Sequence, residues 1–489
     1  MRQFSPICTL PETGPAFISA PNVRSTFDIV WTCITVLILC SWSVLHLTVP
    51  EQYTPKTRRQ RFNLQAARLG LKVKWMLITL IGPEFIFGSA AAAWYLARRN
   101  TPDLQQVAEE DSVPWSRAHT SFADIGGFVL RFHNDDGLVA PGTPNFTRGS
   151  GNSYGMEFED ILATQDDQKL RDKRKKIRAK LEARARRYGT SPWRPHKTHE
   201  MHSAEALKLA ASRSWREVDE SLLLLEGDMW ILTACQLYKA RISGIIPTLP
   251  HVTQEDLDDK NKGDVLVKSL AVAQVSWMVF QVIVRATLSR PSSPLEIMAM
   301  AFAVSTFLFY LLSMDRPQNI NTPFYIHAQR PASADEMAMF AVDASNGDRL
   351  RVQNNDTPYS TRESRSGLIL STPQMVFLIT MALGSLVFGG LHLFGWNSPF
   401  PTDMEKWLWR ASSLVTMLAP ITTLGIVAMI PRPGVMGLGE LASDGVVYTG
   451  LLALAIARLF ITVEAFRSLY YLPPENYVNT WAANIPHFG

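Results

Sequence analysis

The chain has 489 residues, of which 47% are hydrophobic and 19% charged, and its net charge is +4. This composition excludes a disordered chain, and the small net charge excludes the strongly basic field of a nucleic-acid-binding protein, so no nucleic-acid partner is expected. A disulfide framework is also excluded, because Cys33 and Cys40, two of the four cysteines, lie in one apolar run.

Hydrophobic residues are concentrated in runs long enough to cross a membrane as helices. The first, residues 29–49, contains no charged residue and follows a polar tail too long for a cleaved signal peptide, so it is predicted to be a signal anchor. Six further runs lie at 73–96, 265–288, 295–313, 375–395, 407–430 and 445–466. The predicted fold is therefore all-α: a polytopic transmembrane helix bundle of about seven spans, with the lipid bilayer as its surroundings.

The segments between the spans differ in character. Residues 97–264 are predicted to form a partly helical extramembrane lobe with a basic helix at Lys169–Arg187, and residues 314–374 an irregular loop. Within the lobe, Ser221–Tyr238 is interpreted as a buried soluble helix and not an eighth span, because it contains two acids in mid-run. The remaining parts are an N-terminal tail (1–28), spans 1–2 (29–96), spans 3–4 (265–313), spans 5–7 (375–466) and a C-terminal tail (467–489).

The charges of the short loops predict the orientation. Pro50–Lys72 has six basic residues and one acid, which predicts a cytosolic loop. Alternation of seven spans then places the N-terminus and both large segments on the lumenal side, where Asn145 and Asn355 would be glycosylated, and the C-terminus in the cytosol. Lys169–Arg187, with eleven bases and two acids, disagrees, because such a run prefers a cytosolic leaflet. The expected location is the endoplasmic reticulum or another endomembrane.

Three patterns outside the spans resemble catalytic or metal sites. Gly151–Gly155 matches the G-x-S-x-G nucleophile elbow but lacks the preceding strand that the elbow requires. His196, His199 and His202 are interpreted as a solvated turn and not as metal ligands. The acids of residues 255–264 are interpreted as a hydrated membrane edge, with Asp264 capping the third span. No metal is expected.

Charged residues inside the spans are the strongest candidates for function, because ionisable groups are costly in lipid. Glu84 follows Pro83 in the second span, where the proline can bend the helix toward a cavity. A desolvated carboxyl keeps its proton and can act as a general acid. The alternative is an ion pair between Glu84 and Arg285 or Arg458.

Two other spans carry polar groups. In the third, Gln274, Gln281 and Arg285 fall on one helix face near Trp277. In the last, Glu464 is expected to pair with Arg467. Glu296 follows Ser293 and Pro294 and is interpreted as part of a capping box.

Several strings together carry a resemblance: Arg24–Ile29, Trp75–Glu84, Asp259–Asp264 with the polar third span and Glu296, Ala457–Glu464, Pro473-Pro474 and Ile485–His487. They resemble a large fungal family of polytopic membrane proteins, most without assigned chemistry. The resemblance covers about half of the chain and excludes Lys169–Arg187. Proteins of this general kind occur beside meroterpenoid pathways, so the resemblance implies an integral membrane terpene cyclase.

Two hypotheses follow. In the first, the protein is a cofactor-independent isomerase that cyclises a prenylated, often epoxidised, lipophilic small molecule of secondary metabolism. Glu84 would be the acid, with Arg285 and Glu464 as further charged groups of the catalytic set. The substrate-binding residues would be Trp31, Trp75, Gln274, Trp277 and Gln281, with aromatic faces stabilising the migrating positive charge. In the second, the protein is a non-enzymatic lipid or sterol binder, or is transporter-like.

Overall fold

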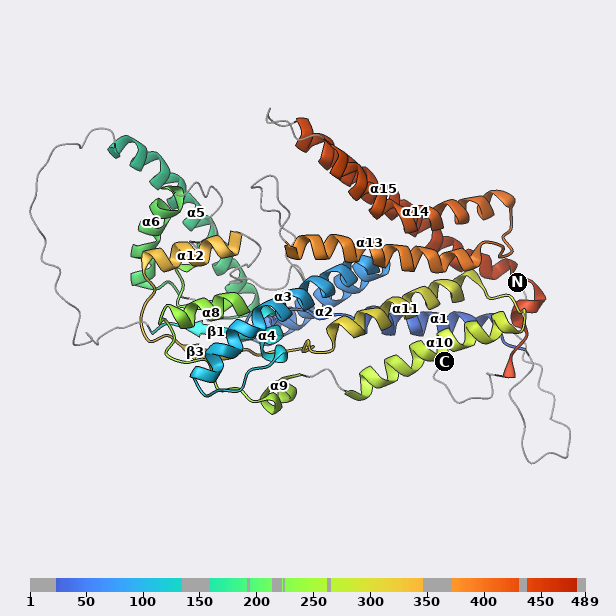
Figure 1. Ribbon diagram of the computed structural model, residues 1–489, viewed down its shortest axis with the longest axis horizontal. Coiled ribbons are helices and arrows are strands. Elements are labelled where there is room, and N and C mark those ends of the chain that lie inside the picture. The colour runs from blue at the N-terminus through green and yellow to red at the C-terminus, as the bar shows by residue number, and fades with distance from the viewer. Residues whose placement is uncertain are drawn as a thin grey trace, which may run out of the picture. The chain divides into compact units, whose positions relative to one another are not determined.

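The computed structural model describes residues 23–133, 159–190, 194–212, 222, 225–261, 265–345, 372–430 and 438–481 (Figure 1). The chain divides into two compact units. Unit 1 consists of Met1–Cys40, Leu270–Val304 and Leu386–Gly489, and unit 2 of Ser41–Ser269 and Ser305–Ser385. Each unit is described by itself below.

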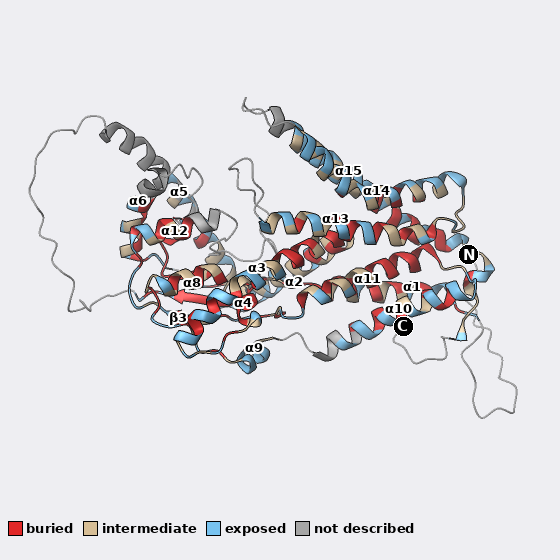
Figure 2. Cartoon of the chain, in the orientation of Figure 1, coloured by how far each residue is buried: buried red, intermediate tan, exposed pale blue. Residues whose placement is uncertain are grey.

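Five helices are long and apolar enough to cross a membrane, which confirms the predicted all-α membrane bundle. They are α1 (Thr26–Ser43), α11 (Pro294–Ser313), α13 (Thr372–His392), α14 (Asp403–Met429) and α15 (Leu438–Arg467). The third predicted span is α10 (Val265–Thr287), whose apolar part, Ala271–Thr287, is shorter. Much of α15 is exposed in Figure 2, as expected of a helix that faces lipid.

The second predicted span is not a single straight helix. It is divided between α2 (Arg58–Ile81) and α3 (Pro83–Glu110), which meet at a bend of 107°. Gly82 between them has φ −144° and ψ 71°, outside the helical region, and Pro83 has no N–H with which to continue the α2 hydrogen bonds. The sequence predicted a bend at Pro83 within one span, and the structure has two separate helices there.

The extramembrane lobe contains a small sheet that the sequence analysis missed. Strand β1 (Phe128–Arg131) lies between β2 (Met229–Leu232), which is antiparallel to it, and β3 (Phe324–His327), which is parallel. Phe128 pairs with Leu232 on one side and with Phe324 on the other. Two predictions are therefore wrong: Ser221–Tyr238 is not one helix, since it contains β2, and 314–374 is not wholly irregular, since it contains β3 and α12 (Ala334–Ser345).

Short helices surround this sheet, and their apolar side chains share one core with it (Figure 2). The helices are α4 (Arg117–Asp124), α6 (Lys197–Ser212), α8 (Ala234–Ile242), α9 (Gln254–Lys260) and α12, with the basic helix α5 (Glu159–Tyr188) beside them. Phe122, Phe128, Trp230 and Phe340 are completely buried in this core. We use "lobe" for residues 97–264 together with 314–345.

The chain that leaves α1 also packs onto the lobe. Val49 belongs to the lobe core, and its N–H donates to the carbonyl of Ile125 at 2.9 Å. Thr54 and Thr190 exchange two backbone hydrogen bonds of 3.0 Å, and the amide of Gln60 donates to the carbonyl of Arg186. The first loop and the lobe therefore lie on the same side of the membrane.

This common side changes the predicted topology. The start of α2 contacts α5, and the end of α3 supplies Leu104 and Val107 to the lobe core, so the α2–α3 pair enters the membrane and returns to the same side. The predicted alternation, with Pro50–Lys72 and the lobe on opposite sides, is wrong for this reason. By length and composition five described helices could cross a membrane, and the bent α2–α3 pair is either a sixth, broken span or a re-entrant hairpin. Because both ends of the pair pack on the lobe, we treat it below as a re-entrant hairpin.

The ends of the described chain meet in unit 1. Val23 and Val478 form an antiparallel bridge, and the N–H of Arg24 donates to the carbonyl of Tyr477 at 2.9 Å. These contacts join the start of α1 to the segment after α15, so both ends of the described chain lie on one side of unit 1. Such a bridge requires an even number of crossings between the two ends, whereas the sequence predicted about seven.

Candidate functional site

Glu84 lies in the first turn of α3, directly after the bend of the re-entrant hairpin. Its side chain is buried, and the residue is 4% exposed. The partial positive charge of a helix N-terminus stabilises a carboxylate at this position. Because non-helical backbone within a membrane requires protein around it, the bend is a place where function concentrates.

Aromatic rings surround the bend on the side of α2 and α13. Trp75 of α2, which is 3% exposed, stacks on Phe85 with 6.4 Å between ring centroids. Phe85 in turn meets the edge of Phe377 of α13 at 5.4 Å. Trp75 is thus the one predicted substrate-binding residue that lies in unit 2, and it contacts Phe85, the sequence neighbour of Glu84.

Two glycines let α13 approach α3 closely. A Cβ added to Gly384 would lie 3.3 Å from Cβ of Glu84, and a Cβ added to Gly88 would lie 2.8 Å from the carbonyl oxygen of Phe377. The second distance is shorter than a van der Waals contact, so only glycine fits there. The helices therefore hold Glu84 in a fixed place.

The other predicted site residues belong to unit 1. Trp31 is 53% exposed on α1 and stacks on Phe27, so it does not line a buried wall in this unit. Gln274 and Trp277 are buried on α10, and Gln281 is half-buried. The Nε2 atom of Gln274 has no hydrogen-bond partner among the residues that the structure describes.

A buried ionic cluster in unit 1 surrounds Glu296. Arg24 donates two hydrogen bonds to its carboxylate, at 2.5 and 3.0 Å, and both residues are less than 10% exposed. The capping box with Ser293 is confirmed: the Ser293 N–H and hydroxyl donate to Oε2 of Glu296, and the Glu296 N–H donates back to the hydroxyl. The sequence analysis found the cap but missed Arg24, which is 272 residues away in the chain.

Arg285 lies in the same cluster and anchors the C-terminal segment. Its guanidinium donates to the carbonyls of Pro291, Asn476 and Val478 at 2.6 to 3.1 Å. Nε of Arg24 donates to the same Asn476 carbonyl at 2.8 Å. These bonds give Arg285 a structural role, and the catalytic role expected of it stays a prediction.

Glu464 pairs with Arg467 at 3.6 Å, which confirms the predicted contact near the end of α15. Arg467 also forms an ion pair with Glu405 at the start of α14. Glu464 is 2% exposed, whereas the Arg467 side chain is 46% exposed, and the Arg467–Glu405 pair joins α15 to α14 at one end. The catalytic role expected of Glu464 stays a prediction.

Two of the three histidines of the predicted solvated turn, His196 and His199, are buried, and His202 is half-buried, so the interpretation as a solvated turn is wrong. His199 of α6 is completely buried, and its ring lies 4.2 Å from that of His196. Its Nε2 accepts from the Ala332 N–H at 3.2 Å, which leaves Nδ1 to donate to the carbonyl of Gly227. Burial, followed by the neighbouring His196, lowers the pKa of His199 to about 3. No three His, Cys, Asp or Glu side chains in the described part of the chain are placed to hold a metal ion.

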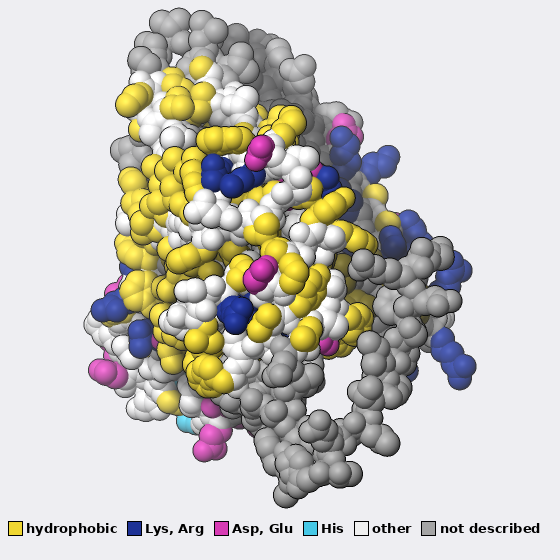
Figure 3. Space-filling model, turned by 90° about the vertical axis from the view of Figure 1, so that its right-hand side faces the viewer, with side chains coloured by type: hydrophobic (Ala, Val, Ile, Leu, Met, Phe, Trp, Pro, Cys, Tyr) yellow, Lys and Arg dark blue, Asp and Glu magenta, His cyan; other side chains and the backbone are white. Residues whose placement is uncertain are grey.

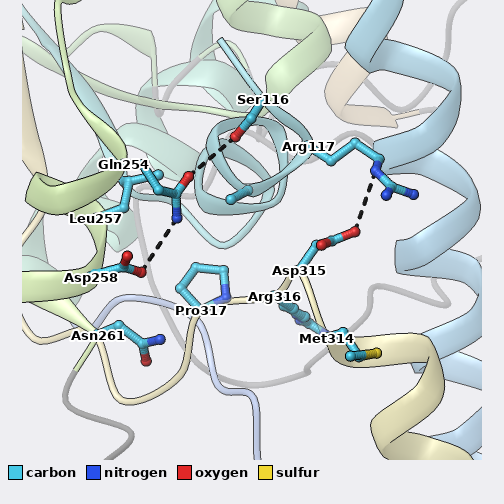
Figure 4. Close-up of a pocket in the computed structure, with 11 residues that line it drawn as sticks. Ser116, Arg117, Gln254, Leu257, Asp258, Asn261, Met314, Asp315, Arg316 and Pro317 are labelled. Carbon is cyan, nitrogen blue, oxygen red and sulfur yellow. Dashed lines mark hydrogen bonds and ion pairs between the residues drawn. The ribbon is translucent and has the colours of Figure 1, made fainter. Parts of the chain in front are cut away.

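An open cavity of about 370 Å³ lies in unit 2 where the chain leaving α11 passes α4 and α9 (Figure 4). Figure 4 shows Arg117 paired with Asp315 at 3.3 Å, and Gln254 bonded to Ser116 and Asp258. The polar groups on its rim thus bond to one another. It is a hydrated cleft, unlike the dry aromatic pocket that carbocation chemistry requires.

Several predicted features lie outside the described residues: Asn145, Asn355, Gly151–Gly155 and Asp264. The acids of 255–259 form the exposed helix α9, in which Asp256 and Thr253 make a capping box.

Comparison with known proteins gives one match. Residues 4–136 and 236–348, together half of the chain, match a family described as "Family of unknown function (DUF8562)". No curated protein and no solved structure gives a significant match. The matched segments carry α1 to β1 and α8 to α12, and therefore the re-entrant hairpin, Glu84, Arg24 and Glu296. The chain is a membrane protein that belongs to this family of unknown function.

Proposed function

We propose that the protein is a membrane-embedded enzyme that cyclises a prenylated, lipophilic intermediate, with Glu84 as the proton donor. The observation that carries the proposal is the burial of this carboxyl at the bend between α2 and α3, where the adjacent Phe85 packs on Trp75 and Phe377. An acid in a water-excluded, aromatic environment is what protonation of an alkene or epoxide requires.

In the proposed reaction the Glu84 proton opens an epoxide or adds to a double bond. The substrate's own π electrons then close the ring, and loss of a proton from carbon returns the acid, so atoms and charge balance without a cofactor. The carboxylate formed on donation lies at the N-terminus of α3, which stabilises it. The aromatic faces would stabilise the positive charge as it migrates.

The proposal rests on fewer residues than the sequence suggested. Arg285 and Glu464 make structural contacts in unit 1, and the proposed reaction uses neither of them. Glu84 and Trp75 remain, with Phe85 and Phe377 as additions that have no polar signal in the sequence.

The test is Glu84→Gln, which keeps size and hydrogen bonding but cannot donate an acidic proton. Membranes containing the expressed chain are incubated with a farnesylated phenol epoxide, and cyclised product is measured by mass spectrometry. Loss of the acid should lower turnover by about 10²–10⁴-fold. Exposed Glu475→Gln serves as the matched control. Equal product from wild type and Glu84→Gln would refute the proposed mechanism.

A second candidate is a non-enzymatic lipid or sterol binder, or a transporter-like protein. The re-entrant hairpin favours it, because broken helices in membranes commonly line binding cavities. Under this alternative, a labelled sterol or prenylated phenol would bind to the wild type and be recovered unchanged. Recovery of a cyclised isomer in the same assay excludes it.

The proposed location is the endoplasmic reticulum or another endomembrane, where lipophilic intermediates of secondary metabolism dissolve. Fluorescence of a tagged chain with an endoplasmic-reticulum marker tests it; labelling confined to the plasma membrane would contradict it.

A further inference from the structure

The first helix of the re-entrant hairpin, α2, combines a basic end with an apolar stripe. It has six basic residues and no acidic one. Its exposed large hydrophobic residues follow one face at intervals of four or seven positions: Phe62, Leu69, Val73, Leu77 and Ile81. Figure 3, which looks at the molecule from the right-hand side of Figure 1 and does not single out α2, shows hydrophobic side chains over much of its coloured surface. The stripe is therefore lipid-facing, and it begins within the basic end of the helix.

The basic end of α2 packs beside the basic end of α5. The amides of Gln60 and Asn63 donate to the carbonyls of Arg186 and Arg187, and Arg184 of α5 pairs with Glu51 at 3.1 Å. These contacts all lie within unit 2. We define the α2–α5 surface as the exposed bases Arg58, Arg59, Arg61, Arg186 and Arg187, together with Phe62.

The depth of this surface follows from the hairpin. α2 enters the membrane from the side of the lobe, and its apolar stripe starts at Phe62, one turn after Arg58. The guanidinium groups around this first turn therefore lie at the level of the lipid headgroups. Arginine binds phosphate with two parallel hydrogen bonds, so a cluster at this depth fits phosphate esters.

We propose that the α2–α5 surface binds the headgroups of anionic phospholipids in the leaflet on the side of the lobe. Juxtamembrane bases gain attraction from an anionic leaflet, and the gain falls off within a Debye length. An acidic protein or nucleic acid fits less well, because Phe62 and Leu69 continue the surface into lipid. The proposal is independent of any catalysis at Glu84.

The experiment uses the full chain in nanodiscs of phosphatidylcholine mixed with phosphatidylserine. The ratio of the two lipids that co-purify after gentle detergent extraction is measured by mass spectrometry. The Arg58→Gln/Arg59→Gln/Arg61→Gln variant should lose selectivity for phosphatidylserine, about fivefold for each base that contacts a headgroup. Raising the salt concentration should weaken the wild-type selectivity in the same direction.

Two controls make the result decisive. Lys175→Gln/Lys176→Gln/Lys197→Gln removes the same charge from exposed lobe positions outside the surface and should leave selectivity unchanged. Arg58→Lys/Arg59→Lys/Arg61→Lys keeps the charge and should retain most of the selectivity for phosphatidylserine. A loss seen with glutamine but not with lysine at these positions is then due to lost charge and not to misfolding. Equal phosphatidylserine enrichment in the wild type and the first variant would overturn the proposal, as would an equal loss in the lobe control.

Discussion

Glu296→Gln is the substitution for which the structure predicts the largest loss of stability. The Glu296 carboxylate is 2% exposed and receives both terminal nitrogens of Arg24, the Ser293 hydroxyl and the Ser293 N–H. Its removal leaves two buried guanidinium groups, Arg24 and Arg285, without their nearest counter-charge. Leaving a buried charge uncompensated typically costs about 3–5 kcal/mol, a large part of the stability of a domain.

Part of this loss should be recovered by a second substitution. Arg24→Gln/Glu296→Gln removes both members of the pair, so the double variant should be more stable than Glu296→Gln alone, with a coupling of about 0.5–3 kcal/mol. The coupling is measured from the thermal unfolding of Arg24→Gln, Glu296→Gln and the double variant, each purified in the same detergent. Exposed Glu475→Gln is the control and should unfold as the wild type does. If Glu296→Gln unfolds together with this control, the cluster does not stabilise the fold as inferred.

Three further predictions concern the lobe, the topology and the helix packing. His199 is neutral in the fold, with a pKa of about 3, and has an ordinary pKa of about 6.5 when unfolded, so its contribution to stability is present above pH 6.5 and is lost as pH falls toward 3. In chemical denaturation, the loss of unfolding free energy between pH 7 and pH 5 should therefore be smaller in His199→Gln than in the wild type by about 2 kcal/mol. An equal loss in the two proteins would contradict this. If the basic first loop is cytosolic, the lobe is cytosolic too. Glycosidase treatment should then leave the electrophoretic mobility unchanged, and tags at both chain ends should face the lumen. A glycan at Asn145 together with a first loop shown to be cytosolic would refute the re-entrant hairpin. Gly88→Ala should destabilise the chain by about 1–3 kcal/mol in thermal unfolding, because the added methyl group meets the Phe377 carbonyl. Gly70→Ala is its control, since a methyl group there meets nothing within 4 Å. Equal unfolding temperatures of the two variants would contradict the close packing of α3 on α13.

Hydropathy and charge predicted the features that are local in the chain. Long apolar runs became helices α1, α10, α11, α13, α14 and α15, and the spacing of Ser293 and Glu296 predicted their capping box. Glu464 and Arg467, one turn apart, were predicted to pair and do so. In each case the interaction depends on neighbours within a few positions.

Features that depend on distant partners could not be read in this way. Each strand of the lobe has only four residues, too few for an alternating pattern to distinguish it from its surroundings. His199 is flanked by polar residues and looks solvated, yet its partners are the backbones of Gly227 and Ala332. The same holds for the topology: Pro83 indicated a bend, but the packing of Val49 on the lobe decides that the hairpin returns.

The bridge between Val23 and Val478 also constrains how the protein is made. Arg24 is synthesised at the start of the first helix, but the Asn476 carbonyl to which it donates lies 452 residues later in the chain. Arg285 likewise donates to the carbonyls of Asn476 and Val478, which follow it in synthesis. Both guanidinium groups therefore lack these acceptors until residues 476–478 have been made, so this cluster can form only after α15 has been synthesised.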